Sequence, residues 1–200
     1  LANVFRDVSF DVRAGEILGV AGLVGSGRSN VAETLFGVTP ASSGTIELFG
    51  KPVDITSPTV AIKNRMAFLT EDRKDTGCLL ILNVLENMQI AVLQDGFVKG
   101  GFVQEGAIES TCEDMARRLR VKTPSIFQKV GTFSGGNQQK VVIAKWLYRG
   151  SSVLICDEPT RGIDVGAKAE IYELMGQLAA EGKGILVVSS DLPELMSICH

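Results

Sequence analysis

Three short and almost wholly apolar runs constrain the fold of this chain more than any other feature. They are "EILGVAG" (16–22), "SSVLICDEP" (151–159) and "GILVVSS" (184–190). A strand that is apolar along its whole length must be buried on both faces, as the strands of a parallel sheet are. Helical patterns follow the first two runs, at about 28–36 and at 166–182. This alternation predicts an α/β protein with a parallel sheet.

The remaining pattern adds shorter elements and a helical insert. Residues 8–13 should form a strand that turns at Ala14-Gly15 into the first apolar run. We expect two more strands, then three helices that form a subdomain, and a surface loop at "DGFVKGGF" (95–102). The expected strands are 43–50 and 66–70, and the expected helices are 82–93, 105–121 and 135–150.

Composition excludes several classes of function. The net charge is −3, without the basic stripe typical of a nucleic-acid surface. The only histidine is the last residue, so a Ser-His-Asp triad, a histidine-ligated metal and a histidine general base are excluded within the chain. The four cysteines are far apart, which favours reduced thiols. A chain that starts with leucine reads as an excerpt of a longer protein.

A glycine-rich loop, "GLVGSGRS" (22–29), joins the first apolar strand to a helix. Such glycines let several backbone N–H groups point at one anion, and a helix N-terminus adds its positive dipole end. The pattern is G-x-x-x-x-G-R-S, where a phosphate loop has G-x-x-x-x-G-K-[ST]. Ser29 is placed to bind Mg²⁺. A dinucleotide loop would need glycine at Asn30, and a strand–helix turn without a ligand stays as the alternative.

Arg28 stands where the phosphate loop normally carries lysine. Arginine keeps the positive charge but is bulkier and planar, with a fork of fixed geometry. We therefore expect nucleotide binding to survive at this loop and hydrolysis to weaken.

Two acids end the strand "VLICDEP". The carboxyl edge of an open α/β sheet is where ligands bind, so Asp157 could hold Mg²⁺ and Glu158 could orient and deprotonate a water that attacks a γ-phosphate. The alternative is a turn before Pro159. A second anion-binding helix start lies at "FSGGNQQK" (133–140), where the alternative is a plain Ser134 N-cap.

Taken together these stretches resemble the ATP-binding-cassette (ABC) ATPases. "GLVGSGRS" resembles their phosphate loop, "FSGGNQQ" their signature motif, "VLICDEPT" their Walker B strand and "GID" the loop that follows it. The resemblance implies a P-loop NTPase (RecA-like) fold, with a parallel sheet core, an antiparallel strand region and an inserted helical subdomain. The nucleotide-binding core would be about 1–75 and 150–200, and the helical subdomain about 76–149.

The resemblance also implies ATP and Mg²⁺ as ligands and a head-to-tail pair of cassettes. The signature residues Ser134, Gly135 and Gly136 would contact nucleotide held by the partner cassette. Metal ligands would be Ser29, Asp157 and Glu71, and Phe5 is a candidate for stacking on adenine. The nucleotide-binding residues would be Gly22, Gly25, Ser26, Gly27, Arg28, Ser29, Asn30, Ser134, Gly135 and Gly136.

Three positions depart from the family pattern. Arg28 replaces lysine, Glu71 stands where glutamine is usual, and Ser190 stands where a switch histidine is usual. The catalytic candidates are Glu158, Glu71 and Ser190. We expect an asymmetric protein, in which this chain's own site is weakened while its signature serves the partner's ATP.

Further stretches of the sequence, such as "TEDRK" and "DEPTRGIDVGAK", resemble the second cassette of bacterial monosaccharide importers. This implies a first cassette in the same chain, transmembrane permease subunits, indirectly a periplasmic sugar-binding protein, and a peripheral place on the cytoplasmic face of the inner membrane. No nucleic acid is expected as a partner. Candidate contacts to the permease are Leu79, Leu80, Leu82 and Val84, with core packing as the alternative.

Other functions stay open at this point. The chain could be an ATP-binding regulatory half that does not hydrolyse, or the cassette of a nucleoside or signal-molecule importer. A cassette of DNA repair or translation would usually show basic surface or long insertions. A phosphate-loop kinase would leave "SGGNQQK" without a role.

Overall fold

The structure is a computed structural model that describes residues 5–91, 98–99, 102–103 and 105–199. The chain divides into two compact units. The core unit comprises residues 1–68, 151–159 and 175–200, and the helical unit comprises residues 69–150 and 160–174. The helical unit thus includes a stretch after the acidic strand, beyond the range of about 76–149 expected from the sequence.

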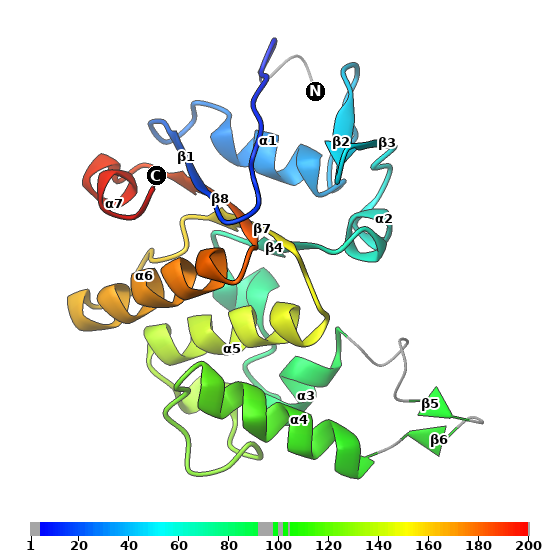
Figure 1. Cartoon of the computed structure of the whole chain (residues 1–200). Helices are drawn as coiled ribbons and strands as arrows, with labels where there is room; N and C mark the ends of the chain where they lie inside the picture. The colour runs from blue at the N-terminus through cyan, green and yellow to red at the C-terminus, as the bar shows by residue number, and fades with distance from the viewer. Residues whose placement is uncertain (1–4, 92–97, 100–101, 104, 200) are drawn as a thin grey trace. The chain divides into compact units, whose positions relative to one another are not determined.

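A four-stranded sheet forms the centre of the core unit, with strand order β1-β8-β7-β4 (Figure 1). β8 pairs in parallel with β1 on one side and with β7 on the other. All six residues of β8 are buried, because strands flank it on both sides and helices α1 and α7 pack on the sheet. The strands are β1 (Ile17–Ala21), β4 (Met66–Leu69), β7 (Val153–Asp157) and β8 (Gly184–Ser189), and the helices are α1 (Arg28–Leu35) and α7 (Leu192–Ile198). The fold class predicted from the sequence is confirmed.

Some elements of the core unit were not foreseen. An antiparallel pair, β2 (Ile46–Leu48) with β3 (Lys51–Val53), follows α1, and only its first strand was predicted. Helix α2 (Pro58–Lys63) begins after Ser57 with proline in its first turn, a sequence signal that was overlooked. α7 begins after its N-cap Asp191, whose carboxylate accepts a hydrogen bond from the N–H of Glu194.

The strand expected at residues 8–13 is wrong. These residues are irregular, and Val8 and Phe10 are 48% and 40% exposed. Their alternating pattern suits a half-buried strand, but no neighbouring strand pairs with them in the described part of the chain. The turn itself is present, with Gly15 at φ 85° and its N–H bonded to the carbonyl of Lys183.

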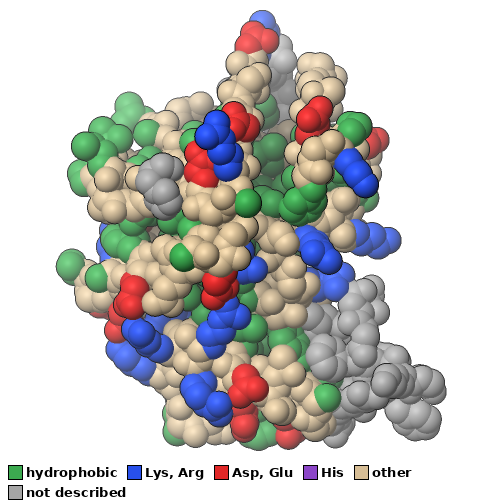
Figure 2. All heavy atoms as spheres, in the orientation of Figure 1, with side chains coloured by type: hydrophobic (Ala, Val, Ile, Leu, Met, Phe, Trp, Pro, Cys, Tyr) green, Lys and Arg blue, Asp and Glu red, His purple; other side chains and the backbone are tan. Residues whose placement is uncertain are grey.

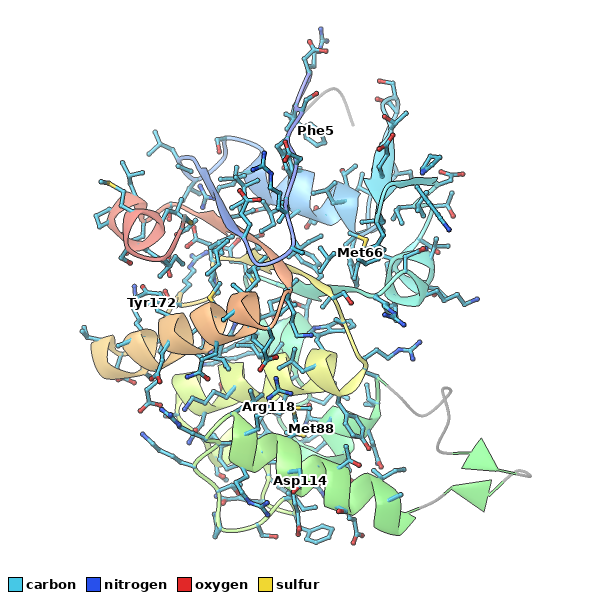
Figure 3. All side chains as sticks on the ribbon, viewed as in Figure 1. Phe5, Met66, Met88, Asp114, Arg118 and Tyr172 are labelled. Atoms are coloured by element: carbon cyan, nitrogen blue, oxygen red, sulfur yellow. The ribbon has the colours of Figure 1, made fainter. Side chains whose placement is uncertain are left out.

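Three helices of the helical unit pack on one another (Figure 1). The buried Met88 of α3 meets Cys112 of α4, whose thiol donates to the methionine sulfur at 3.2 Å (Figure 3). The elements are α3 (Val84–Gln89), α4 (Glu105–Arg118) and α5 (Gly135–Tyr148), with the short helices η1 (Arg73–Gly77) and η2 (Val130–Thr132). Helix α6 (Val165–Ala180) starts in this unit and ends in the core unit.

The expected surface loop at 95–102 lies partly outside the described residues. Within it, β5 (Val98–Lys99) pairs antiparallel with β6 (Phe102–Val103). No helix in the described ranges is long and apolar enough to cross a bilayer. Acidic and basic side chains are interspersed over the face shown in Figure 2.

Candidate functional site

The glycine loop is built as the sequence pattern predicts. β1 ends at Ala21, and α1 begins at Arg28 after Gly27, which is left-handed at φ 88°. A Cβ at Gly22 would lie 2.5 Å from the Ser26 hydroxyl oxygen, so glycine leaves room for this side chain inside the loop. Gly25, also left-handed at φ 85°, faces open space. Ser29 and Asn30 occupy the first turn of α1. The loop therefore joins β1 to the N-terminus of α1 through left-handed glycines, a conformation in which backbone N–H groups can point at one anion.

Arg28 is directed into the protein. Its Nη1 donates to the carbonyl of Gly22, and its Nη2 lies 2.5 Å from Oε1 of Glu158. Both side chains are buried, 7% and 8% exposed. The guanidinium thus holds the start of the loop and the carboxylate predicted to activate water, with both terminal nitrogens engaged.

Glu158 lies at the carboxyl end of β7 in a left-handed conformation, φ 47°, which is uncommon for a residue with a Cβ. Its backbone N–H donates to the carbonyl of Val188 at 2.8 Å. Oε1 also accepts from the N–H of Ser190 at 2.8 Å. Ser190 therefore contacts this carboxylate through its backbone N–H, and Ser190 itself is exposed.

One residue beside Glu158, Ser189, was missed in the sequence. Ser189 ends β8, and its hydroxyl donates to the buried carboxylate of Glu194 at 2.6 Å and lies 3.5 Å from Oε2 of Glu158. The N–H of Asp191 donates to the same hydroxyl at 3.0 Å. Polar residues directly after an apolar strand were the available signal.

Ser29 and Asp157 lie together as a magnesium site requires. The Ser29 hydroxyl bonds the Asp157 carboxylate and lowers its pKa, but burial outweighs this and leaves the pKa of Asp157 raised. Oδ1 of Asp157 is buried without a hydrogen-bond partner. A hydroxyl and an orphaned carboxylate oxygen fit Mg²⁺, which takes few protein ligands and completes its shell with phosphate and water. Among the described residues, no group of three or more His, Cys, Asp or Glu could hold a metal.

The S-G-G helix start belongs to the helical unit. Ser134 is the exposed N-cap of α5, and its side chain makes no capping hydrogen bond. A Cβ at Gly135 would lie 2.6 Å from Nη2 of Arg73, and a Cβ at Gly136 would lie 2.4 Å from Cβ of Ala167. Gly136 therefore packs closely on Ala167, and Gly135 leaves room for the Arg73 side chain, a reason that the sequence did not reveal.

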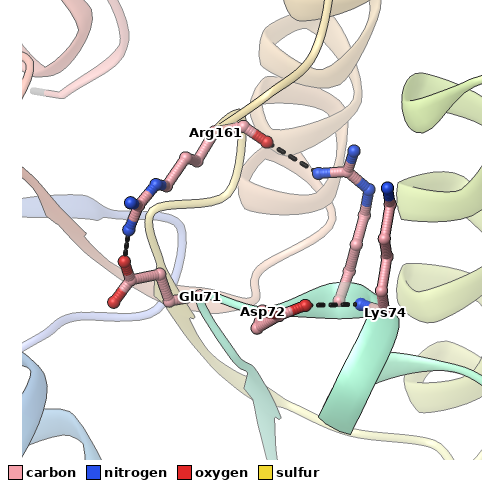
Figure 4. Close-up of a pocket in the computed structure, with 5 residues that line it drawn as sticks. Glu71, Asp72, Lys74 and Arg161 are labelled. Carbon is pink, nitrogen blue, oxygen red and sulfur yellow. Dashed lines mark hydrogen bonds and ion pairs between the residues drawn. The ribbon is translucent and has the colours of Figure 1, made fainter.

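Glu71 also belongs to the helical unit, where Arg161 holds its carboxylate in an ion pair (Figure 4). The pair lines an open cavity of about 500 Å³ together with Asp72, Arg73 and Lys74. The charged run "EDRK" and the arginine of "PTRGID" are thus brought together, although neither arginine had a predicted role. Phe5, the candidate for adenine stacking, lies in the irregular segment before β1 (Figure 3).

The four residues predicted to contact a permease differ in how buried they are. Val84 is fully buried in the helical unit, which is the packing alternative. Leu79 is 47% exposed, while Leu80 and Leu82 are partly exposed. Ile81, which was not predicted, is 79% exposed.

Comparison with known proteins finds ATP-binding proteins both among sequence relatives and among solved structures. The chain is 71% identical, over 99% of its length, to a Rhizobium johnstonii protein named as a ribose/galactose/methyl galactoside import ATP-binding protein. The chain spans only 39% of that relative's length. In fold, it matches a nucleotide-free ATP-binding cassette from an ABC transporter, with a TM-score of 0.81, 20% identity, and coverage of 98% of this chain and 79% of the other.

A second solved structure is a dimeric ATP-binding cassette in a post-hydrolysis state, bound to ADP and Pi. Its TM-score is 0.78 at 20% identity, with coverage of 96% of this chain and 82% of the other. The family model described as ABC transporter matches residues 5–161, which include the loop, the S-G-G helix start and the acidic strand end. This chain belongs to the ABC transporter family.

Proposed function

We propose that this chain is the second ATP-binding cassette of a tandem protein that hydrolyses ATP to power monosaccharide import across the bacterial inner membrane. The observation that carries the proposal is the 71% identity to a relative named for import of ribose, galactose or methyl galactoside. That identity extends over 99% of this chain, so it covers the phosphate loop, the acidic strand end and the S-G-G helix start. The chain would lie peripherally on the cytoplasmic face, with permease subunits and, indirectly, a periplasmic sugar-binding protein as partners.

The ligands of its own site would be ATP and Mg²⁺. The backbone of Gly22–Gly27 would surround the phosphates, and Ser29 and Asp157 would hold the metal. Bound Mg²⁺ supplies positive charge that polarises phosphate oxygens. Glu158 would orient and deprotonate water, but only when Arg28 no longer engages Oε1.

We infer that the two sites of the cassette pair are unequal. The buried ion pair of Arg28 with Glu158 supports a slow site in this chain, since the carboxylate oxygen must leave the guanidinium before it can accept a proton from water. The exposed Ser134, whose hydroxyl is not used as a helix cap, supports a working signature for the partner's ATP. The dimeric cassette of similar fold is consistent with such pairing.

Two substitutions in the full transporter test this asymmetry. Ser134→Ala should abolish sugar-coupled ATP hydrolysis, whereas Arg28→Ala should reduce it much less. Matched controls are the exposed Ser110→Ala on α4 and Arg13→Ala, whose side chain is 84% exposed; both should leave hydrolysis unchanged. Equal losses from Ser134→Ala and Arg28→Ala would overturn the asymmetry.

A silent half is the second candidate, because the same ion pair would suit a cassette that binds ATP without hydrolysing it. Single-turnover phosphate release is measured with the partner's site disabled. Slow release that disappears in Glu158→Gln supports a weak ATPase site. Release no faster than in Glu158→Gln supports the silent half.

The permease would contact the helical unit near Leu79 and Ile81, the exposed apolar residues of the segment before α3. Cysteines placed at these two positions should crosslink to the permease. A cysteine at the buried Val84 should not, and crosslinking only elsewhere would contradict this contact.

A further inference from the structure

Arg73 begins the short helix η1, which is fixed to α5. Asp72 caps η1, because its Oδ1 accepts from the N–H groups of Lys74 and Asp75 at 2.9 and 3.2 Å. At the other end of η1, Nζ of Lys145 on α5 donates to the carbonyl of Gly77 at 2.5 Å. The backbone that carries Arg73 is therefore held on the same helix that the S-G-G turn opens.

The guanidinium of Arg73 reaches the loop between β7 and α6. Nη1 donates to the carbonyl of Arg161 at 2.6 Å (Figure 4). Nη2 donates to the carbonyl of Gly162 at 3.2 Å. Gly162 is left-handed at φ 66°, which turns the loop there. Glu71 holds the side chain of Arg161 in the same region. Two neighbouring carbonyls are thus bound by one planar fork, which lysine could not reproduce.

The same guanidinium contacts the start of α5. A Cβ at Gly135 would lie 2.6 Å from Nη2 of Arg73 and 3.2 Å from the carbonyl oxygen of Gly162. One residue further, Gly136 packs on Ala167 in the first turn of α6. Asp164 caps that turn, accepting from the N–H of Ala167 at 3.0 Å. The S-G-G turn and the loop 161–164 are therefore packed against each other, with Arg73 in contact with both.

We propose that Arg73 is a positioning residue that keeps the S-G-G turn and the loop 161–164 in one fixed arrangement. The inference rests on the proposed function, in which this turn faces nucleotide held by a partner cassette. A phosphate-binding turn must be placed accurately, since a displacement of about 1 Å can cost about 100-fold in rate. Arg73 acts through the turn and the loop and touches no reacting atom.

The test compares Arg73→Ala and Arg73→Lys with a control, Arg117→Ala, in the full transporter. The Arg117 side chain is 76% exposed and pairs with Asp114 on its own helix. Two quantities are measured on each preparation: kcat and KM for ATP, and amide hydrogen exchange in the peptides that contain 134–137 and 160–164. Methylguanidinium is then added to each variant to replace the missing fork.

Both Arg73 variants should exchange faster in both peptides while peptides of α4 keep wild-type protection, and kcat should fall by about tenfold or more. Methylguanidinium should restore part of kcat to Arg73→Ala and none to Arg117→Ala, which shows no loss. Wild-type exchange at 134–137, or an unchanged kcat, overturns the proposal. Where Arg73→Ala does not fold, Arg73→Lys decides by the same criteria. If Ser134→Ala leaves hydrolysis intact, the proposed function fails, and the exchange result still decides whether Arg73 holds the turn.

Discussion

Nη2 of Arg28 lies 2.5 Å from Oε1 of Glu158, in a buried ion pair that joins the first residue of α1 to the end of β7. The arginine also holds the carbonyl of Gly22, and the carboxylate also accepts from the N–H of Ser190. The phosphate loop and the water-activating position are therefore bonded to each other in this protein. This relationship changes how substitutions at either residue are expected to behave.

Removing one partner of this pair should be costly. Arg28→Met leaves the buried charge of Glu158 without compensation, which costs about 3–5 kcal/mol of unfolding free energy. The double variant Arg28→Met with Glu158→Gln removes both charges and should recover most of that loss. Urea unfolding of the wild type, both single variants and the double variant gives the coupling energy. Simple addition of the two single losses would contradict the ion pair.

Asp157→Asn should make the protein more stable but weaken its binding of Mg²⁺. Burial raises the pKa of Asp157, so the folded state binds this proton more tightly than the unfolded state does, and the ionised form destabilises the protein at neutral pH. The variant should therefore melt at a higher temperature, by about 2–4 °C for each kcal/mol gained. Adding Mg²⁺ to the nucleotide-bound protein should raise the Tm of the wild type more than that of the variant. A lower Tm in the variant without ligands would contradict the burial argument.

Glu170 on α6 should contribute stability that depends on pH. Hydrogen bonds from Lys140 and then Lys122 lower the pKa of Glu170 from its ordinary value of 4.5 to about 2. A depressed carboxyl pKa stabilises the folded state above the unfolded value, and this contribution is lost as pH falls from about 4.5 through about 2. Glu170→Gln should thus lower the urea midpoint at pH 7 and have little effect near pH 2. An equal effect at both pH values would be inconsistent with this pKa.

Gly136→Ala should destabilise the protein, and a second substitution at Ala167 should reverse much of the loss. In Gly136→Ala the new Cβ would lie 2.4 Å from Cβ of Ala167, an overlap that costs about 1–3 kcal/mol. Ala167→Gly in the same chain should remove the overlap and restore much of the stability. The control is Gly176→Ala, where nothing lies within 4 Å and alanine should stabilise helix α6 by about 0.5–1 kcal/mol. Thermal unfolding of the three variants and the wild type checks this, and a destabilised Gly176→Ala would argue against a steric cause.

Local pattern was sufficient for much of the fold and for part of the site. β1, β7 and β8 were predicted because a strand buried on both faces must be apolar throughout, and the loop at 22–29 because its glycine spacing is tied to backbone conformation. Prediction failed at residues 8–13, since a strand exists only where a neighbour satisfies its backbone. It also missed α2 and α7, which are short and have weak periodicity.

The amino-acid sequence by itself determined the family, the order of the motifs and the residue types at each candidate position. Only the tertiary structure decided which of these side chains bond to one another: Arg28 to Glu158, Glu71 to Arg161, and Arg73 to the carbonyls after the acidic strand. The physical reason is that each of these contacts joins residues far apart in the chain. Periodicity and motif spacing report on neighbours along the backbone, whereas a charge pairs with whatever the fold brings within a few ångströms.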